Sequence, residues 1–213
     1  MGAKSLAREP QGSTKARILD AAEHVFAQRG FAGASTREIA ARAGVNISSL
    51  HYHWASKETL YVAVFRDVFA RILAHLEGSV APLLESDPGR DGRSDRVDRI
   101  MNELFDFFAG QPHVPRLLLR RIVEPDPLDE GLERQVLGPA WARFSEWTRR
   151  AGLDDAATRL FMLSLHSVVM VYALDSPPYR AVLGGSLTDR GVGEAVRVHL
   201  GQLARGLLER MAG

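Results

Sequence analysis

The sequence contains no cysteine. This absence excludes disulfide bonds, thiol catalysis and thiolate metal ligands, and it is typical of proteins that work in a reducing compartment. Residues 1–15 contain charged side chains but no apolar stretch, so they do not have the pattern of a secretory signal. We therefore expect a cytoplasmic protein.

The sequence also lacks an apolar run long enough to cross a membrane. Its most apolar segment, residues 160–174, is interrupted by Ser164, His166 and Ser167, whereas a membrane span needs roughly 18 apolar residues in a row. We interpret this segment as a buried helix, and we expect no membrane partner.

Signatures of catalysis are absent as well. The sequence has no phosphate-cradling glycine loop, no nucleophile elbow and no Glu-x-x-His metal pair. His51 and His53 lie about 200° apart around a helix, so they cannot share a metal ion there. We expect no enzyme activity, no cofactor and no metal. The alternative, an enzyme with a pocket in the C-terminal part, rests on four carboxylates: Glu103, Asp106, Glu124 and Glu130.

Charged side chains are distributed unevenly along the chain. Residues 1–60 hold 8 Lys and Arg against 5 Asp and Glu, and they contain all three lysines, Lys4, Lys15 and Lys57. An imbalance of this size is more typical of a solvated surface than of a phosphate-binding one. It therefore indicates nucleic-acid binding only if a motif accompanies it.

Apolar residues recur at helical spacing along nearly the whole chain, and no segment alternates in the manner of a β-strand. We therefore predict an all-α protein of about nine helices, in which an N-terminal three-helix head precedes a C-terminal helical body. Turn-forming residues make 85–95 the clearest loop. The predicted helices cover residues 14–29, 35–43, 47–53, 56–84, 95–109, 114–123, 129–151, 154–174 and 190–211.

The segment from residue 35 to residue 54 has the pattern of a helix-turn-helix. Ser35 followed by Glu38 predicts a capping box at the start of one helix. Gly44 then supplies a turn that tolerates positive φ, and Asn46 can cap the next helix. The residues that lock two such helices together are small or apolar. Here they are Ile39, Ala40, Ala43, Val45 and Leu50.

The short helix 47–53 has two different faces. Leu50 and Trp54 point inward, whereas Ser48 and Tyr52 point the opposite way. A helix with such a polar outer face can lie in the major groove of DNA, where Ile47 can contact only a thymine methyl. We predict that four residues lie near base edges: Asn46, Ile47, Ser48 and His51. We predict that four others contact phosphates: Thr36, Tyr52, His53 and Lys57.

Residues 14–65 resemble the DNA-binding domain of the TetR family of transcriptional regulators. The family pattern is a first helix ending in Gly-Phe, then T-x-x-x-I-A-x-x-A-G-V, a short recognition helix ending in an aromatic residue, and S-K-E at the fourth helix. The matching elements here are Gly30-Phe31 and residues 36–45, 50–54 and 56–58. The match spans about a quarter of the chain, and it is specific because many spaced elements agree.

Two positions depart from the family pattern. The residue after Leu50 is often tyrosine in the family and is His51 here, which puts any contact carried over to that position in doubt. The closing aromatic is often phenylalanine and is Trp54 here, which we expect to fill the same notch in the core.

The resemblance also implies an organisation and a mode of action. Residues 1–12, before the first predicted helix, are expected to form a flexible arm; the resemblance implies a DNA-binding domain (13–58) and an effector-binding and dimerisation domain (59–213). It further implies a homodimer that binds a near-palindromic double-stranded operator and is released by a small-molecule effector. Repression is the usual outcome in the family, and activation is the less common alternative.

The body contains two sets of candidate residues for these roles. A stripe on the last helix is compatible with the implied dimer interface, although it can instead face the chain's own core: Val192, Val196, Leu200, Leu203 and Leu207. A second set, with few charged members, favours an apolar or aromatic effector, although its members can equally be plain core or hydrogen-bonded histidines: Phe105, Phe108, His113, Trp141, Phe144, Met162 and His166.

A protein-binding helical bundle without DNA-binding activity is the other alternative. In that case residues 35–54 form an ordinary helical hairpin with a solvated outer face. Sequence-specific, salt-sensitive binding to DNA would exclude this alternative.

Overall fold

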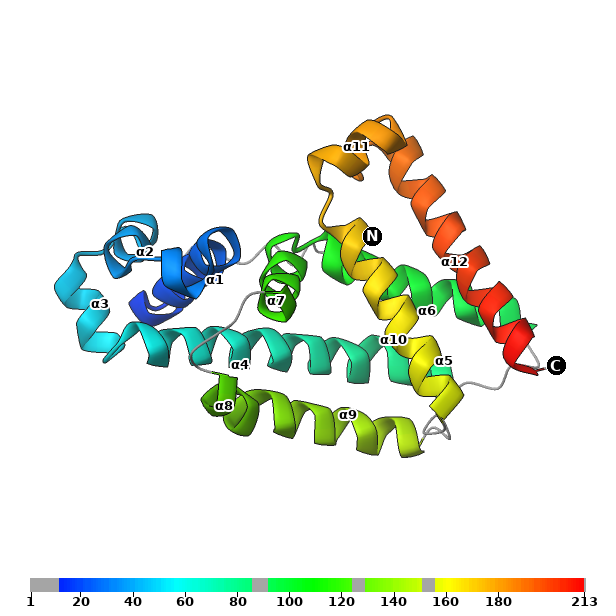
Figure 1. The fold of residues 1–213 in the computed structure, drawn as a ribbon, viewed down its shortest axis with the longest axis horizontal. Helices are drawn as coiled ribbons and strands as arrows, with labels where there is room; N and C mark the ends of the chain where they lie inside the picture. Colours follow the sequence, from blue (N-terminus) through cyan, green and yellow to red (C-terminus); the bar gives the residue numbers. More distant parts are fainter. Residues whose placement is uncertain (1–11, 86–91, 124–128, 151–155, 213) are drawn as a thin grey trace, which may run out of the picture.

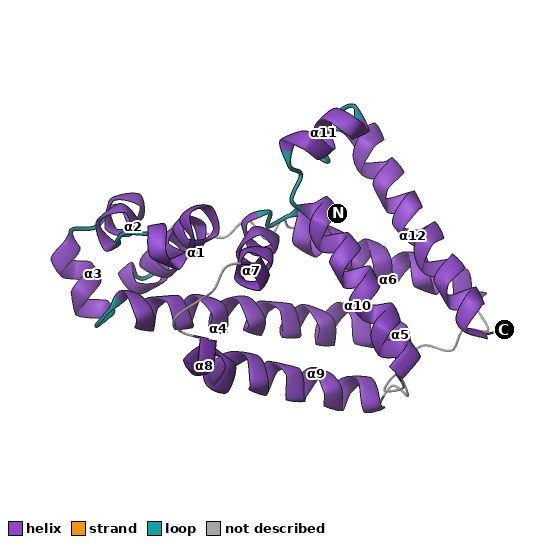
Figure 2. Ribbon diagram, in the orientation of Figure 1, coloured by secondary structure: helices purple, strands orange, loops and turns teal. Residues whose placement is uncertain are grey.

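A computed structural model describes residues 12–85, 92–123, 129–150 and 156–212. Every regular element in these ranges is a helix, as Figure 2 shows. The prediction of an all-α protein is therefore confirmed. Residues 1–11 of the predicted arm and residues 86–91 of the predicted loop lie outside the described ranges.

The head consists of α1 (Thr14–Gly33), α2 (Thr36–Ala43) and α3 (Ile47–His53). Each of these helices is preceded by a polar N-cap residue, Ser13, Ser35 or Asn46. Helix α3 is capped as expected, with Asn46 Oδ1 accepting from Ser49 N at 2.7 Å. Gly30 adopts φ 69° within α1. It bends the end of α1 where the sequence predicted that the helix stops.

A long helix joins the head to the body. It comprises α4 (Lys57–His75), a π-helical turn (Leu76–Val80) and α5 (Ala81–Glu85). Ser56 and Thr59 cap its start reciprocally, each side chain accepting from the other's backbone N–H. Figure 1 shows α4 running from beneath the head into the body.

The body is built from the remaining helices. Helices that are far apart in the sequence pack together (Figure 1). Helix α6 lies against both α10 and α12, and α8 and α9 pack alongside α4. Helix α7 stands between α1 and the body. The bounds are α6 (Gly92–Ala109), α7 (His113–Val123), α8 (Asp129–Leu132), a π-helical turn (Glu133–Leu137), α9 (Gly138–Arg150), α10 (Ala156–Ala173), α11 (Pro177–Leu183) and α12 (Arg190–Ala212).

Helix α11 was missed because Pro177 and Pro178 suggested a break between helices. Proline is tolerated in the first turn of a helix, since its absent N–H has no partner there. Here Pro177 opens α11, which ends at Gly184 with φ 76°. Helix α6 also begins at Gly92, three residues before the predicted start.

One hydrophobic core runs from the head into the body. Its fully buried large side chains come from α1 to α4, α6 to α8, α10 and α12. They are Phe26, Phe65, Phe105, Ile18, Ile39, Leu50, Leu60, Met101, Leu117, Leu132, Met170 and Leu200.

No single helix in the described ranges is both long enough and apolar enough to cross a membrane. The segments Arg159–Ala173 and Pro177–Leu183 meet this criterion by length and composition only when they are taken together, and a 92° bend separates them.

Candidate DNA-binding interface

The helix-turn-helix of α2 and α3 is held by apolar contacts on its inner side. Ile39 and Leu50 are fully buried, and Ala40 and Ala43 are nearly so. Ser35 Oγ accepts from Glu38 N at 3.1 Å. The Glu38 side chain does not complete the expected capping box, because its carboxylate pairs with Arg29 at 3.5 Å.

The turn between α2 and α3 is fastened to α1. Gly44 adopts φ 64° as predicted. Arg17 donates from Nη2 to the Gly44 carbonyl oxygen at 2.9 Å and from Nε to the Ala43 carbonyl oxygen at 3.2 Å. These carbonyls lie at the C-terminal end of α2, where a cation is favourable. No local pattern in the sequence indicates this role of Arg17, because its partners are distant along the chain.

The outer face of α3 is open to solvent. Ser48, His51 and Tyr52 are exposed, and the Tyr52 side chain retains 85% of its accessible surface. The rings of Tyr52 and His53 lie 5.1 Å apart. Ile47 is half-buried and packs against the core. The residues of α3 that are predicted to contact DNA therefore lie close together. Asn46 lies beside them, and its Oδ1 atom caps the helix.

Lys57 lies at the start of α4 and is already engaged within the head. Its Nζ donates to the carbonyl oxygens of Phe31 at 3.0 Å and Ala34 at 3.1 Å, and it lies 4.4 Å from the centre of the Phe31 ring. An ammonium group has three donor hydrogens, so one remains for another acceptor. Lys57 thus holds the bend of α1 against α4, a role that the sequence did not indicate.

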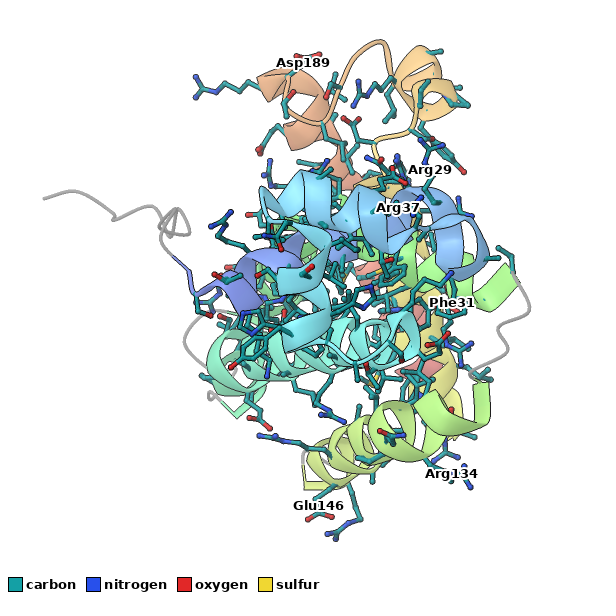
Figure 3. All side chains as sticks on the ribbon, turned by 90° about the vertical axis from the view of Figure 1, so that its left-hand side faces the viewer. Arg29, Phe31, Arg37, Arg134, Glu146 and Asp189 are labelled. Carbon is teal, nitrogen blue, oxygen red and sulfur yellow. The ribbon has the colours of Figure 1, made fainter. Side chains whose placement is uncertain are left out.

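Arg37 is a second residue that sequence analysis missed. It is exposed beside Thr36 in the first turn of α2, and no described residue forms an ion pair with it. Figure 3, which looks onto the head, shows Arg37 and Arg29 on its surface. A cation is unfavourable at a helix N-terminus. An arginine in the first turn of a helix, where it does not stabilise the helix, is the sequence signal by which Arg37 could have been found.

Trp54 closes α3 as the predicted aromatic anchor. It packs against the core, and Lys15 Nζ lies 5.0 Å from the centre of its ring. This cation–π contact joins the start of α1 to the end of α3. The turn and the C-terminal end of the helix-turn-helix are thus both tied to α1, by Arg17 at Gly44 and by Lys15 at Trp54.

The residues proposed for an effector pocket are not gathered in one place. His113 faces the head, where its Nε2 lies 2.9 Å from Glu23 Oε1. Trp141 is 55% exposed on α9. Phe108 and His166 do meet, with ring centres 6.0 Å apart. Phe105 is buried in the core, Met162 is half-buried, and the Phe144 side chain lies outside the described part of the structure.

The surroundings of His166 affect its charge. The side chain keeps contact with solvent, but the protein around it removes enough water to lower the pKa of the imidazole below its ordinary value of 6.5. Met162 lies one helical turn away on the same face of α10. The two residues and Phe108 form the part of the predicted set that the fold brings together.

The predicted dimer stripe on α12 is divided between core and surface. Val196 and Leu200 are 3% and 0% exposed, because they pack into the chain's own core. Val192, Leu203 and Leu207 are half-buried. Apolar side chains that remain exposed lie elsewhere on the same pair of helices: Leu160 and Leu163 on α10, and Val198 on α12.

Of the four carboxylates considered for catalysis, the two that the structure describes have different partners. Asp106 pairs with Arg197 at 2.7 Å, and Glu103 lies beside His75, with 3.8 Å between Oε2 and Nε2. Glu124 and the side chain of Glu130 lie outside the described ranges. Among the described residues, no group of three or more His, Asp or Glu side chains has an arrangement suited to a metal ion.

Comparison with known proteins identifies the head. Residues 18–64 match the family model for bacterial regulatory proteins of the tetR family. Among curated proteins, the transcriptional regulator RutR of Escherichia coli K12 is 28% identical over 82% of this chain and 81% of its own length. The transcriptional repressor SCO4008 of Streptomyces coelicolor is 28% identical over 96% of this chain and 99% of its own.

The similarity extends to the body as a matter of fold. A TetR-like transcriptional regulator from Rhodococcus sp. RHA1 superposes with a TM-score of 0.62 at 23% identity, over 94% of this chain and 99% of that one. The match to the family model covers the helix-turn-helix described above, with Gly44 at its turn. Residues 18–64 are thus identified as a DNA-binding head of the tetR family of bacterial regulatory proteins, and the chain as a whole is similar to helix-turn-helix transcriptional regulators.

Proposed function

We propose that the protein is a cytoplasmic repressor that binds a near-palindromic operator as a homodimer and leaves it when a small molecule binds to the body. The observation that carries the proposal is the open face of α3, where Tyr52 is 85% exposed on a helix whose other side is locked by buried Leu50. A large aromatic side chain in that position contributes little to folding. It is available to a partner.

The proposed docking places α3 in the major groove. Ser48 and His51 lie on its exposed face, where a hydroxyl and an imidazole can hydrogen-bond to base edges. The Oδ1 atom of Asn46 caps α3, so only its Nδ2 group is left to donate to a base acceptor. Ile47 reads at most a thymine methyl.

Phosphates flank α3 in this arrangement. Thr36 and Arg37 lie at the N-terminus of α2, where the helix dipole and free backbone N–H groups attract an anion. Tyr52 and His53 provide a hydroxyl and an imidazole from α3. Lys57 reaches a phosphate with the donor hydrogen that Phe31 and Ala34 leave free. These contacts position the head and carry no sequence information.

Dimerisation uses α10 and α12. Leu160 and Leu163 are 65% and 58% exposed on α10, and Val198 is 50% exposed on α12. We place these three side chains in the interface together with Val192, Leu203 and Leu207, because Val196 and Leu200 are already buried within the chain. A two-fold dimer then presents two copies of α3 to successive major grooves, about 34–36 Å apart.

The body is the proposed effector domain, from residue 59 onward. The effector is apolar or aromatic and lies near Phe108, Met162 and His166, with few charged anchors. It releases DNA only if it binds more tightly to the conformation in which the two heads are wrongly spaced.

Selection from a random pool of double-stranded DNA tests the proposal. We expect enrichment of an inverted repeat with half-site centres one or more helical turns apart, about 10–10.5 base pairs per turn. Light scattering of the complex should show two chains per duplex. Enrichment of no sequence would contradict the DNA-binding function, and a monomer on an asymmetric site would contradict the dimer.

A reporter assay then tests the direction of regulation. The selected operator is placed between a promoter and a reporter gene, and we expect reporter expression to fall when the protein is present. A rise in expression would contradict repression while leaving DNA binding intact. An unrelated inverted repeat of the same length serves as the control.

A further inference from the structure

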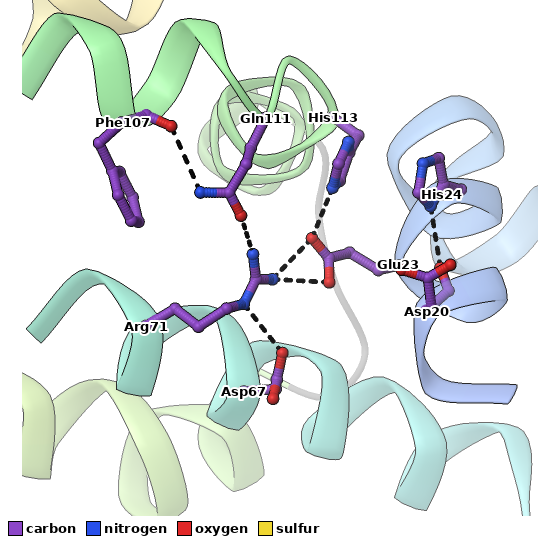
Figure 4. A network of polar contacts seen from close by, with 8 residues as sticks. All are labelled: Asp20, Glu23, His24, Asp67, Arg71, Phe107, Gln111 and His113. Carbon is purple, nitrogen blue, oxygen red and sulfur yellow. Dashed lines mark hydrogen bonds and ion pairs between the residues drawn. The ribbon is translucent and has the colours of Figure 1, made fainter. Parts of the chain in front are cut away.

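A cluster of charged and polar side chains joins the head to the body. It contains Glu23 of α1, Asp67 and Arg71 of α4, and Gln111 and His113 at the turn into α7; we call these five residues the joint. Figure 4 shows that they come from three separate parts of the chain and meet at the Arg71 guanidinium and the Glu23 carboxylate. None of the five residues belongs to the DNA-binding interface or to the hydrophobic core described above.

Glu23 is the centre of the joint. Its side chain is buried, with only 3% exposed. Both of its carboxylate oxygens accept from Arg71 Nη2 at 2.7 Å, and Oε1 lies 2.9 Å from His113 Nε2. A buried carboxylate is costly unless it is paired in this way. Glu23 therefore requires that α4 and α7 remain in their present positions against α1.

Arg71 extends the joint to the body. Its Nε donates to Asp67 Oδ2 at 3.0 Å, and its Nη1 donates to Gln111 Oε1. Gln111 in turn donates from Nε2 to the Phe107 carbonyl oxygen near the end of α6 at 3.3 Å. A displacement of the C-terminal end of α6 therefore shifts Gln111, and this changes the hydrogen bonds of Arg71 with Gln111 and with Glu23.

The contacts of the joint are directional, which distinguishes them from the apolar contacts around them. Apolar surfaces can slide over one another at small cost, whereas charge-assisted hydrogen bonds have a preferred geometry. Arg120 adds a further bond between α7 and α1, from Nη2 to the Gln28 carbonyl oxygen at 3.2 Å. Together these bonds select one orientation of α1 relative to α7.

Helix α1 carries this orientation to the helix-turn-helix. Arg17 lies six residues before Glu23 on α1, and it holds the turn before α3 through the Gly44 carbonyl oxygen. Lys57 fastens the far end of α1 to the start of α4. Any rotation of α1 at the joint therefore moves α3 as well.

We propose that Glu23 is a positioning residue whose buried contacts with Arg71 and His113 fix the angle of α3 relative to the body, and thereby the half-site spacing that the dimer accepts. The proposal rests on the proposed function, because spacing has meaning only for a dimer on an operator. It assigns a role in DNA selection to a residue that does not touch DNA.

The test compares two duplexes, the selected operator and the same operator with one base pair inserted at its centre. The insertion rotates one half-site by about 35° relative to the other. Anisotropy titration gives the ratio of the two dissociation constants, and this ratio does not depend on the fraction of active protein. We expect the wild-type protein to prefer the original spacing by about tenfold or more.

Glu23→Gln keeps the shape of the side chain and removes its charge. We expect the spacing preference to fall to about threefold or less, because the head can then adopt neighbouring orientations at little cost. Glu77→Gln is the matched control. Glu77 also forms a two-bond pair with an arginine, Arg143, at 2.7 Å for each bond, but that pair is exposed and lies away from the head.

A preference in Glu23→Gln equal to that of the wild type would overturn the proposal, since mere destabilisation weakens binding to both duplexes alike. If Glu23→Gln does not fold, His113→Ala decides by the same ratio, because it removes the contact of Glu23 with α7 and leaves the Glu23–Arg71 pair intact. A wild-type protein that binds neither duplex would instead contradict the proposed function.

Discussion

Arg17 and Gly44 are joined by a hydrogen bond of 2.9 Å from the guanidinium to the glycine carbonyl oxygen, across 27 positions of the sequence. The bond ties the first helix to the turn that positions α3. Gly44 serves this contact in two ways: it adopts φ 64°, and a Cβ at this position would lie 3.0 Å from Arg17 Nη2. The geometry of the DNA-binding head thus depends on a residue without a side chain.

We predict that Gly44→Ala lowers the free energy of unfolding by about 1–2 kcal/mol, because alanine is disfavoured at positive φ. Displacement of Arg17 should add to this loss. The measurement is urea unfolding followed by circular dichroism. Gly131→Ala is the control, since that glycine lies in α8 with open space around it; there the change should be stabilising by about 0.5–1 kcal/mol. Equal effects at the two positions would refute the prediction.

Lys57 and Tyr52 are predicted to affect DNA binding by different routes. Lys57→Ala leaves the Phe31 and Ala34 carbonyl oxygens without their donor, so we expect it to lower the free energy of unfolding by about 1–3 kcal/mol. Tyr52→Phe removes an exposed hydroxyl and should change it by no more than about 0.5 kcal/mol. Urea unfolding of both variants gives these values.

Operator titration of the same two variants completes the comparison. We expect Tyr52→Phe to weaken operator binding without any loss of stability, because the hydroxyl contacts a phosphate in the proposed complex. Lys57→Ala should also reduce the dependence of affinity on salt concentration, since it removes a cation from the interface. Unchanged affinity and unchanged salt dependence in both variants would show that neither residue binds a phosphate.

Glu23 makes stability depend on pH. Burial alone would raise the pKa of its carboxyl, but the hydrogen bond from His113 and the charge and hydrogen bonds of Arg71 outweigh burial, so the pKa lies below 4.5. The stabilisation is therefore complete above the unfolded-state pKa of 4.5 and is lost as the pH falls through the folded-state pKa. The dependence belongs to the acidic range, not to neutral pH.

Urea unfolding from about pH 6 down to about pH 3 measures this dependence. Wild-type stability should fall over the acidic part of the range, and the fall should be smaller in Glu23→Gln, whose amide does not titrate. At neutral pH we expect that variant to be less stable by at most about 3–5 kcal/mol, since the amide retains one acceptor. A parallel pH dependence in the two proteins would show that another group is responsible.

The head was largely predictable from sequence because its determinants are local. Asn46, Ser56 and Gly44 act on backbone groups within a few positions, so spacing alone indicates the caps and the turn. The pattern was less informative where one residue type serves two purposes. Pro177 was interpreted as a break, yet it occupies the first turn of α11.

The contacts between elements were not predictable. Glu23 looks like a solvated residue on the first helix, and its partners Arg71 and His113 follow 48 and 90 positions later. Helical spacing likewise identified the apolar stripe on α12 but not the direction that it faces, and Val196 and Leu200 proved to be buried within the chain. Such pairings are set by how the helices pack, which a single sequence does not encode in any local pattern.

The most direct test of the account is the specificity of the double variant Ser48→Ala/His51→Ala, measured by anisotropy on the selected operator and on a random duplex of equal length. Both side chains are exposed on α3, so the fold should be unaffected. We predict that operator binding weakens by about 1–3 kcal/mol for each side chain that no longer reaches a base. Affinity for the random duplex should change by less than about twofold, because the residues proposed to bind phosphates remain. Operator affinity within about twofold of the wild type would contradict the claim that the exposed face of α3 reads the DNA sequence.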